Sequence, residues 1–349
     1  MTFPKGALTR LFSLAFAATL LFSLLMHVQP AASSVADFYS RKQITLLIST
    51  GPGGGYDLYG RLLASHMGKH IPGTPTIIPR NQPGAGGLQV VNYAYNQGPN
   101  DGTLMFTLHV GLPLHQAMEG TGVQFDAAKI ISIGRLGSGN AGTGVSAASG
   151  VRLFKDIMSR EIVVGATQPS SNSAVFPKVA ADLLGAKIKV VTGYKSMDEL
   201  MLAMERGEVA GFGSGGLASM ESAYANFEFG KDYFVLFQWG LVREPKWSDV
   251  PLASELASNS TDRKALEVLS AQMDIGRSYY LPPKVPTDRV AALRTALKDT
   301  TEDPNFQRSA QTAHAEITYL GGPEMEKIIA DVLAAPKEAL TRLKAATAY

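Results

Sequence analysis

Apolar and polar positions alternate in short blocks along the first part of the chain, and each apolar run ends in a turn rich in glycine or polar residues. After a turn, apolar residues recur at the spacing of a helix. This order predicts strand–turn–helix units, which form a parallel sheet with right-handed crossovers. The predicted strands are 43–49, 76–80 and 103–109, and the predicted helices are 56–69 and 87–95.

A second series of the same kind begins near residue 160. Its predicted strands are 161–167, 187–192, 209–213 and 233–239, and its predicted helices are 174–184 and 196–206. The glycine- and serine-rich segment 130–149 separates the two series and is predicted to connect them. The last part contains Pro282, Pro283 and Pro286, and is predicted to form short helices and a terminal helix from Pro323.

Two series of units in one chain predict an α/β fold with two Rossmann-like lobes. We expect residues 37–138 to form the first lobe, 139–254 the second lobe, and 255–349 to return to the first lobe and end in helices. Ligands of open α/β sheets lie outside the carboxyl ends of the strands, so two facing sheets predict one ligand cleft between the lobes. That is the geometry of a hinge-closing binding protein.

Residues 1–36 have the pattern of a secretory signal peptide. Lys5 and Arg10 precede an apolar run of about 16 residues, which is shorter than the ~20 needed to span a bilayer. Small residues at Ser34 and Ala36 predict cleavage after Ala36. The alternative is that this run is a membrane anchor. No later stretch of the sequence is apolar enough to span a bilayer, so we expect no membrane insertion after cleavage.

Composition removes several classes of function. The chain has no cysteine, so lipid attachment through cysteine, disulfides and thiolate ligands are excluded. Loss of Lys5 and Arg10 with the signal would leave equal numbers of basic and acidic residues. Without a basic block, nucleic acid is not an expected partner.

The first glycine turn is the most informative stretch of the sequence. Glycines let the backbone approach a ligand, and amides at a helix N-terminus suit an anion. Asp57 could cap or charge the following helix, and a tight turn without a ligand is the alternative. The candidate ligand-binding residues here are Thr50, Gly51, Pro52, Gly53, Gly54, Gly55, Tyr56 and Asp57.

The turn 81–87 repeats this arrangement one strand later, so the two turns could bind opposite sides of one carboxylate. Its candidate residues are Pro83, Gly84, Ala85, Gly86 and Gly87. His109, at the end of the third predicted strand, could donate a hydrogen bond to that carboxylate or have a structural role. Arg61 and Arg80 could supply a countercharge, or lie on the surface.

Other chemistries find little support. The first turn lacks the lysine and hydroxyl residues of a phosphate loop, and strand-like sequence follows the formal dinucleotide match at 137–142. His66 and His70 share a helix face without an acidic ligand, so a solvated face is expected and no metal site. No nucleophile elbow is present. We therefore expect no catalytic residues, metal or cofactor.

Ordered motifs over nearly the whole chain after residue 36 resemble the substrate-binding receptors of tripartite tricarboxylate transporters, the Bug family. The motifs are Pro52-Gly53-Gly54-Gly55-Tyr56-Asp57 with Arg61, then 81–87, 99–104, 191–194, 207–209 and Pro286-Thr287. The resemblance implies lobes joined by crossing strands, and a carboxylate held by both glycine turns, partly through water. This sequence differs from the commoner family pattern at Gly55-Tyr56, at His109 and in the second-lobe turn, which lacks a glycine run.

The resemblance also implies that the second lobe contacts the distal part of the ligand. The residues in the matching places are Gln168, Ser170, Ser171, Asn172, Ser173, Tyr194 and Ser214. The expected function is that of a periplasmic solute-binding protein which captures a small organic carboxylate and delivers it to a membrane transporter. The alternatives are a periplasmic sensor that signals to a membrane-bound histidine kinase, and an exported enzyme.

Overall fold

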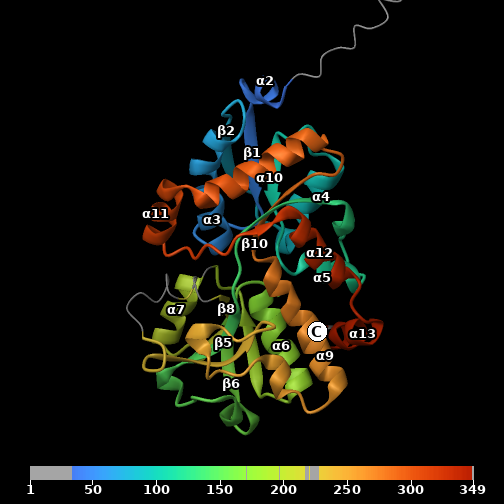
Figure 1. Cartoon of the computed structure of the whole chain (residues 1–349). Helices are drawn as coiled ribbons and strands as arrows, with labels where there is room; N and C mark the ends of the chain where they lie inside the picture. Colours follow the sequence, from blue (N-terminus) through green and yellow to red (C-terminus); the bar gives the residue numbers. More distant parts are fainter. Residues whose placement is uncertain (1–33, 170, 196, 217–219, 221–227, 348–349) are drawn as a thin grey trace, which may run out of the picture.

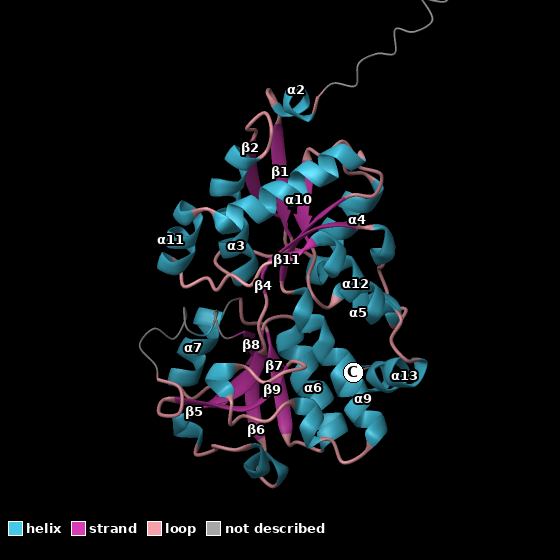
Figure 2. Cartoon of the chain, in the orientation of Figure 1, coloured by secondary structure: helices cyan, strands magenta, loops and turns pink. Residues whose placement is uncertain are grey.

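The computed structural model describes residues 34–347 apart from 170, 196, 217–219 and 221–227. The chain forms two α/β lobes, one above the other in Figure 1, each built around its own sheet. Figure 2 shows helices packed against the strands of both lobes. The two-lobed α/β fold predicted from the sequence is therefore confirmed.

The six-stranded sheet of the first lobe has the order β11-β4-β10-β3-β1-β2. Its strands are β1 (Gln43–Ile48), β2 (Thr76–Asn81), β3 (Leu104–Thr107), β4 (Ile131–Gly137), β10 (Arg277–Leu281) and β11 (Leu320–Gly321). The helices of this lobe are α2 (Val35–Tyr39), α3 (Gly55–His66), α4 (Leu88–Asn96), α5 (Leu112–Ala117), α10 (Thr287–Glu302), α11 (Pro304–Thr312) and α12 (Gly322–Leu333). Short 3₁₀ turns are η1 (Met67–His70), η2 (Ala85–Gly87) and η3 (Ala127–Lys129).

The five-stranded sheet of the second lobe has the order β7-β6-β8-β5-β9. Its strands are β5 (Ala141–Ser146), β6 (Ile162–Ala166), β7 (Ile188–Thr192), β8 (Gly211–Gly216) and β9 (Tyr233–Trp239). The helices are α6 (Asn172–Leu184), α7 (Met197–Glu205), α9 (Ser260–Ala271) and α13 (Lys337–Thr347). The 3₁₀ turns are η4 (Ala147–Ser149), η5 (Phe154–Met158), η6 (Pro245–Trp247), η7 (Ala253–Leu256) and η8 (Gln272–Ile275).

The sheets are mixed, whereas the sequence predicted parallel ones. β1 pairs in parallel with β2 and β3, but β10 runs antiparallel to β3 and β4. In the second lobe β6 is parallel to β7 and β8, but β5 is antiparallel to β8 and β9. The connector predicted at 130–149 contains two complete strands, β4 in one sheet and β5 in the other. It supplies the antiparallel strand β5 of the second sheet, whereas the antiparallel strand β10 of the first sheet comes from the later part of the chain. The dinucleotide-like match at 137–142 falls on this crossing.

The last part of the chain returns to the first lobe later than expected. The prediction placed that return at residue 255, but Leu266 and Leu269 of α9 lie in the apolar core of the second lobe. The return comes at β10, and α13 then places Leu343 in the second core, next to α9 in Figure 1. An amphipathic pattern shows that a helix is half-buried but does not show which sheet it covers.

The predicted signal peptide falls mostly outside the described residues. The structure begins with Ser34, whose hydroxyl caps α2 by accepting a hydrogen bond from the Asp37 amide. The predicted cut after Ala36 falls inside this helix, and it stays a prediction. No helix in the described part of the chain is long and apolar enough to cross a membrane.

Candidate functional site

The two glycine turns lie at one edge of the first sheet. β1 lies between β2 and β3, with Ile48 opposite Asn81 and Leu47 opposite Phe106. Because the three strands are parallel, their carboxyl ends meet. The turn after β1, the turn after β2 and His109 after β3 are therefore brought together as predicted from strand order.

The Asp57 carboxylate stabilises the first turn through hydrogen bonds. Its side chain is almost fully buried, and its oxygens accept hydrogen bonds from the Gly53 amide (3.0 Å), Arg61 Nε (2.9 Å) and Asn81 Nδ2 (2.8 Å). Burial raises the pKa of Asp57, but these hydrogen bonds outweigh it and hold the pKa below its ordinary value. Asp57 is thus an ionised residue whose partners lie within the protein, which favours support of the turn over ligand contact.

Asn81 joins the two turns. Its Nδ2 also donates to the Thr50 carbonyl (3.0 Å), and its Oδ1 accepts from Arg61 Nη2 (2.7 Å). One amide side chain at the end of β2 therefore fixes both ends of the turn that follows β1. The Arg61 guanidinium forms an ion pair with Asp57 and a hydrogen bond with Asn81. It is therefore not the free countercharge for a ligand that the sequence allowed. Arg80 lies exposed on β2.

The backbone of the first turn presents amide groups at the N-terminus of α3. Gly54 is the N-cap, so the amides of Gly55 and Tyr56 lie in the first helical turn, where no intrahelical acceptor exists. The Gly53 amide is taken by Asp57. A helix N-terminus with free amides favours an anion. Pro52, Gly53 and Gly54 are exposed, so a ligand can reach this face.

The second turn approaches the ends of β1 and β3 closely. Gly87 has φ +94°, and a Cβ there would lie 3.2 Å from the Cβ of His109 and 3.4 Å from that of Ser49. Gly86 also has a positive φ, of 63°. Backbone conformation favours glycine at both positions, and the close approach of His109 and Ser49 also favours it at Gly87.

Tyr56 and His109 form an aromatic pair next to the turns. Their ring centroids are 5.6 Å apart, and the Tyr56 hydroxyl accepts a hydrogen bond from the Val110 amide (3.0 Å). Burial, followed by the charge of Arg277, lowers the pKa of His109 to about 4. The Gly111 amide donates to His109 Nδ1 at 3.4 Å, which leaves the proton of the neutral ring on Nε2. His109 is therefore a neutral donor.

Arg277 lies beside the first turn but was not among the site residues predicted from the sequence. It begins β10, and its guanidinium carbon lies 4.6 Å from the Tyr56 ring centroid. A Cβ on Gly55 would lie 3.0 Å from Arg277 Nε, and a Cβ on Gly216 would lie 3.9 Å from its Nη2. The signal was present, since Ser278-Tyr-Tyr-Leu281 is rich in strand formers, but the nearby prolines drew the prediction toward loops and short helices.

The turn after β6 in the second lobe uses hydroxyl groups that bond to one another. Ser173 Oγ accepts from the Thr167 amide (3.0 Å) and lies 2.7 Å from Ser171 Oγ. The Ser171 hydroxyl donates to the Gln168 carbonyl (2.7 Å). These serines hold the turn together, while the side chain of Gln168 is exposed. Ser170 lies outside the described residues.

The other predicted second-lobe residues lie in different surroundings. Asn172 Oδ1 is 3.4 Å from the position that a Cβ on Gly111 would take, so Asn172 faces the first lobe beside His109. Tyr194 packs against β6, where a Cβ on Gly165 would lie 3.1 Å from its ring. Ser214 is buried on β8, two residues before Gly216. Contact with a ligand stays a prediction for all of them.

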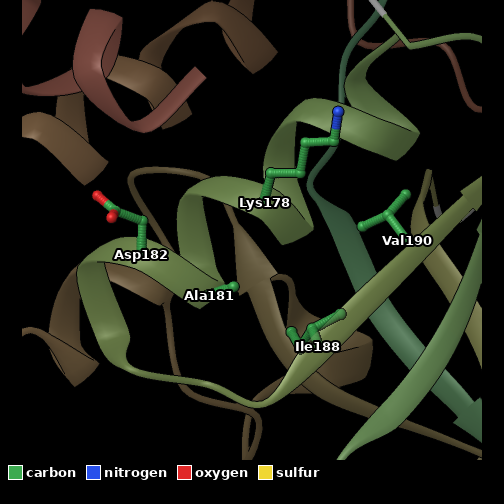
Figure 3. Close-up of a pocket in the computed structure, with 5 residues that line it drawn as sticks. All are labelled: Lys178, Ala181, Asp182, Ile188 and Val190. Atoms are coloured by element: carbon green, nitrogen blue, oxygen red, sulfur yellow. The ribbon is translucent and has the colours of Figure 1, made fainter. Parts of the chain in front are cut away.

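The remaining candidate features lie elsewhere. A hollow of about 350 Å³ lies beside α6 and β7. Figure 3 shows the residues that line it, Lys178, Ala181, Asp182, Ile188 and Val190. None of these is a predicted site residue. The expectation of a solvated face for His66 and His70 is wrong, because both rings are half-buried against the segment around α11, 3.1 Å from Ser309 Oγ and Asp303 Oδ2 respectively. The described residues contain no cluster of three or more metal-ligating side chains.

The chain has two α/β lobes with glycine-rich strand ends in the first lobe, and the comparisons with known proteins bear on this fold. No family model and no curated protein matches the sequence. Among solved structures, the chain is similar to a TctC solute-binding protein from Polaromonas, at 19% identity and a TM-score of 0.60 over 85% of this chain and 96% of that one.

Two further similar structures are of proteins with a dicarboxylate. Rpa4515 from R. palustris "with adipate" shows 17% identity and a TM-score of 0.66 over 88% of this chain and 98% of that chain. MatC from Rhodopseudomonas palustris "with bound malate" shows 16% and 0.64 over 88% and 99%. The fold implied by the sequence resemblance is therefore confirmed, since the chain shares the fold of TctC- and Bug-type solute-binding proteins.

Proposed function

We propose that the protein is a periplasmic receptor which binds a small organic carboxylate and delivers it to a tripartite tricarboxylate-type membrane transporter. The observation that carries the proposal is the link made by Asn81. It ties the two glycine turns to one edge of the sheet, with the amides of Gly55 and Tyr56 at the N-terminus of α3. Amides arranged in this way bind carboxylates without chemistry on them.

The proposal assigns different roles to the two lobes. The glycine turns bind one carboxylate, His109 Nε2 donates a further hydrogen bond, and Gln168 and Asn172 contact the distal part of the ligand. Adipate and malate in the descriptions of similar structures support a carboxylate as the ligand class. No nucleophile or acid–base pair is assigned a role, so we expect capture and release without turnover.

The direct test is a thermal-shift and calorimetric screen of the protein lacking the signal segment, against mono-, di- and tricarboxylates. A ligand that binds only the folded protein stabilises it by RT ln(1 + L/Kd), where L is the free ligand concentration, so a hit raises Tm further as its concentration rises. If no acid of any chain length stabilises the protein, the proposal is wrong. Delivery is tested separately, by measuring whether cells that lack the protein lose uptake of the acid that binds.

A further inference from the structure

The strand ends of the first lobe hold a positive charge that the rest of the site does not neutralise. Asp57 is the acid nearest the first turn, and Arg61 compensates it directly. Arg277 lies on the other side of the same turn, against Gly55 and the Tyr56 ring. In the described residues, the ion pairs involve other cations, and no carboxylate lies within ion-pair distance of Arg277.

Gly55 and Tyr56 accommodate the Arg277 side chain. Gly55 leaves the space that a Cβ would fill at 3.0 Å from Nε, and Tyr56 supplies a ring face at 4.6 Å. Gly55, Tyr56 and His109 are also the places where the sequence differs from the pattern it resembles. These three residues therefore form one unit around a guanidinium, which is planar and presents paired donors that match a carboxylate.

Arg277 lies where both lobes can reach it. It contacts the first glycine turn through Gly55, and its Nη2 lies near Gly216 at the end of β8. At the start of the same turn, Thr50 Oγ1 is buried and has no hydrogen-bond partner in the described part of the chain. Arg277 hydrogen-bonds to the Tyr56 side chain but has no carboxylate partner among the described residues. An anion with several acceptor oxygens could accept from this guanidinium, from the free amides and from the Thr50 hydroxyl together.

We propose that Arg277 binds the ligand's carboxylate together with the amides of the first glycine turn, and that the ligand class is an organic acid without a basic amino group. The second part follows because the acid nearest the first turn, Asp57, is already paired, so no described carboxylate there is free to receive an ammonium group. This inference rests on the proposed function and adds the charged residue that selects the ligand.

The test compares Arg277→Gln and Arg277→Lys with Arg80→Gln, an exposed arginine on the neighbouring strand. The probes are succinate, adipate, malate and citrate, the neutral amides succinamide and adipamide, and the amino acid L-aspartate. Binding is measured by calorimetry at two salt concentrations, and folding by circular dichroism.

We expect the unmodified protein to prefer each acid over its amide, and succinate over aspartate. Arg277→Gln should lose about 10- to 100-fold in affinity for the acids, the size of a lost charged hydrogen bond, and lose the acid-over-amide preference. Arg277→Lys should keep part of the preference, and Arg80→Gln all of it. A purely structural role of Arg277 would not change the acid-over-amide ratio.

A second variant keeps the test decisive if Arg277→Gln fails to fold. Gly55→Ala keeps the charge but crowds the guanidinium, and it should reduce the acid-over-amide ratio while leaving the net charge unchanged. If the protein binds acids but Arg277→Gln binds them with an unchanged ratio, this inference is overturned and the proposed function stands. Equal binding of succinate and aspartate overturns the ligand class. Binding of no acid at all overturns both proposals.

Discussion

The two lobes contain the same three-stranded arrangement but use it differently. In each, the first parallel strand lies between the second and the third, as β2-β1-β3 and as β7-β6-β8. After β1 comes a glycine turn whose backbone is exposed, whereas after β6 comes a turn whose serines bond to one another. The same topology thus exposes backbone groups in one lobe and a turn held by its own side chains in the other.

Under the proposed function, the glycine turns would be a fixed anchor for the carboxylate, and the second-lobe turn an adjustable selector for the rest of the ligand. Backbone amides need no particular side chain, but they need buried support, which Asp57 and Asn81 supply. In the second lobe Gln168 and Asn172 can change without dismantling the turn, because Ser171 and Ser173 hold it. Predictions that separate anchor from selector follow, from the largest expected effect to the smallest.

Gly54→Phe should abolish carboxylate binding, because a large side chain at the N-cap of α3 covers the free amides. Stability should change little, since a Cβ at Gly54 meets nothing within 4 Å and its φ is −90°. Gly54→Ala is the matched control and should weaken binding only mildly. Calorimetry and a melting curve check both, and tight binding by the phenylalanine variant would contradict the role of the first lobe as anchor.

Asp57→Ala should lower the free energy of unfolding by about 2–4 kcal/mol, because it leaves the Gly53 amide and Arg61 Nε without their acceptor and removes one of the two acceptors of Asn81 Nδ2. Urea unfolding measures this change. The control is Asp331→Ala, which breaks the exposed Lys327–Asp331 pair and should cost less than about 0.5 kcal/mol. Equal effects of the two changes would mean that Asp57 does not support the turn.

His109 should make the protein less stable in acid. Its pKa in the folded protein is about 4, below the ordinary 6.5, so the unfolded chain takes up a proton first as the pH falls. The free energy of unfolding should therefore fall between pH 6.5 and 4, by about 2 kcal/mol after allowance for solvent screening. His109→Gln should remove this part of the pH dependence, measured by urea unfolding across that range.

Ser173→Ala should cost about 1 kcal/mol of stability, since the Thr167 amide loses its acceptor at a partly buried position. Urea unfolding measures this cost. Affinity should fall only through the looser turn, by less than the loss at Gly54. A complete loss of binding with unchanged stability would instead make Ser173 a direct ligand contact.

Gln168→Ala should leave stability unchanged, because the side chain is exposed. It should alter the ranking of acids of different length by less than about tenfold, the size of one neutral hydrogen bond. The screen of mono-, di- and tricarboxylates measures the ranking. An unchanged ranking would remove Gln168 from the selector.

The sequence alone determined the units of this protein. Apolar runs ending in glycine or polar turns located β1, β2 and β6 to within a few residues, because local alternation and turn chemistry act over short distances. The same local signals placed both glycine turns at one sheet edge, since parallel strands end together. The resemblance to solute-binding receptors rested on those turns as well.

Tertiary structure decided what lies between distant segments. Nothing in the local pattern pairs Asn81 with Thr50 and Asp57, or brings Arg277 from far along the chain against Gly55. The antiparallel strands β4, β5 and β10, and the second-lobe position of α13, likewise depend on which apolar surface each element meets. Burial and hydrogen bonding between segments far apart in sequence set these contacts. The glycine turns could therefore be predicted from the sequence, whereas the position of Arg277 beside them depends on the tertiary structure.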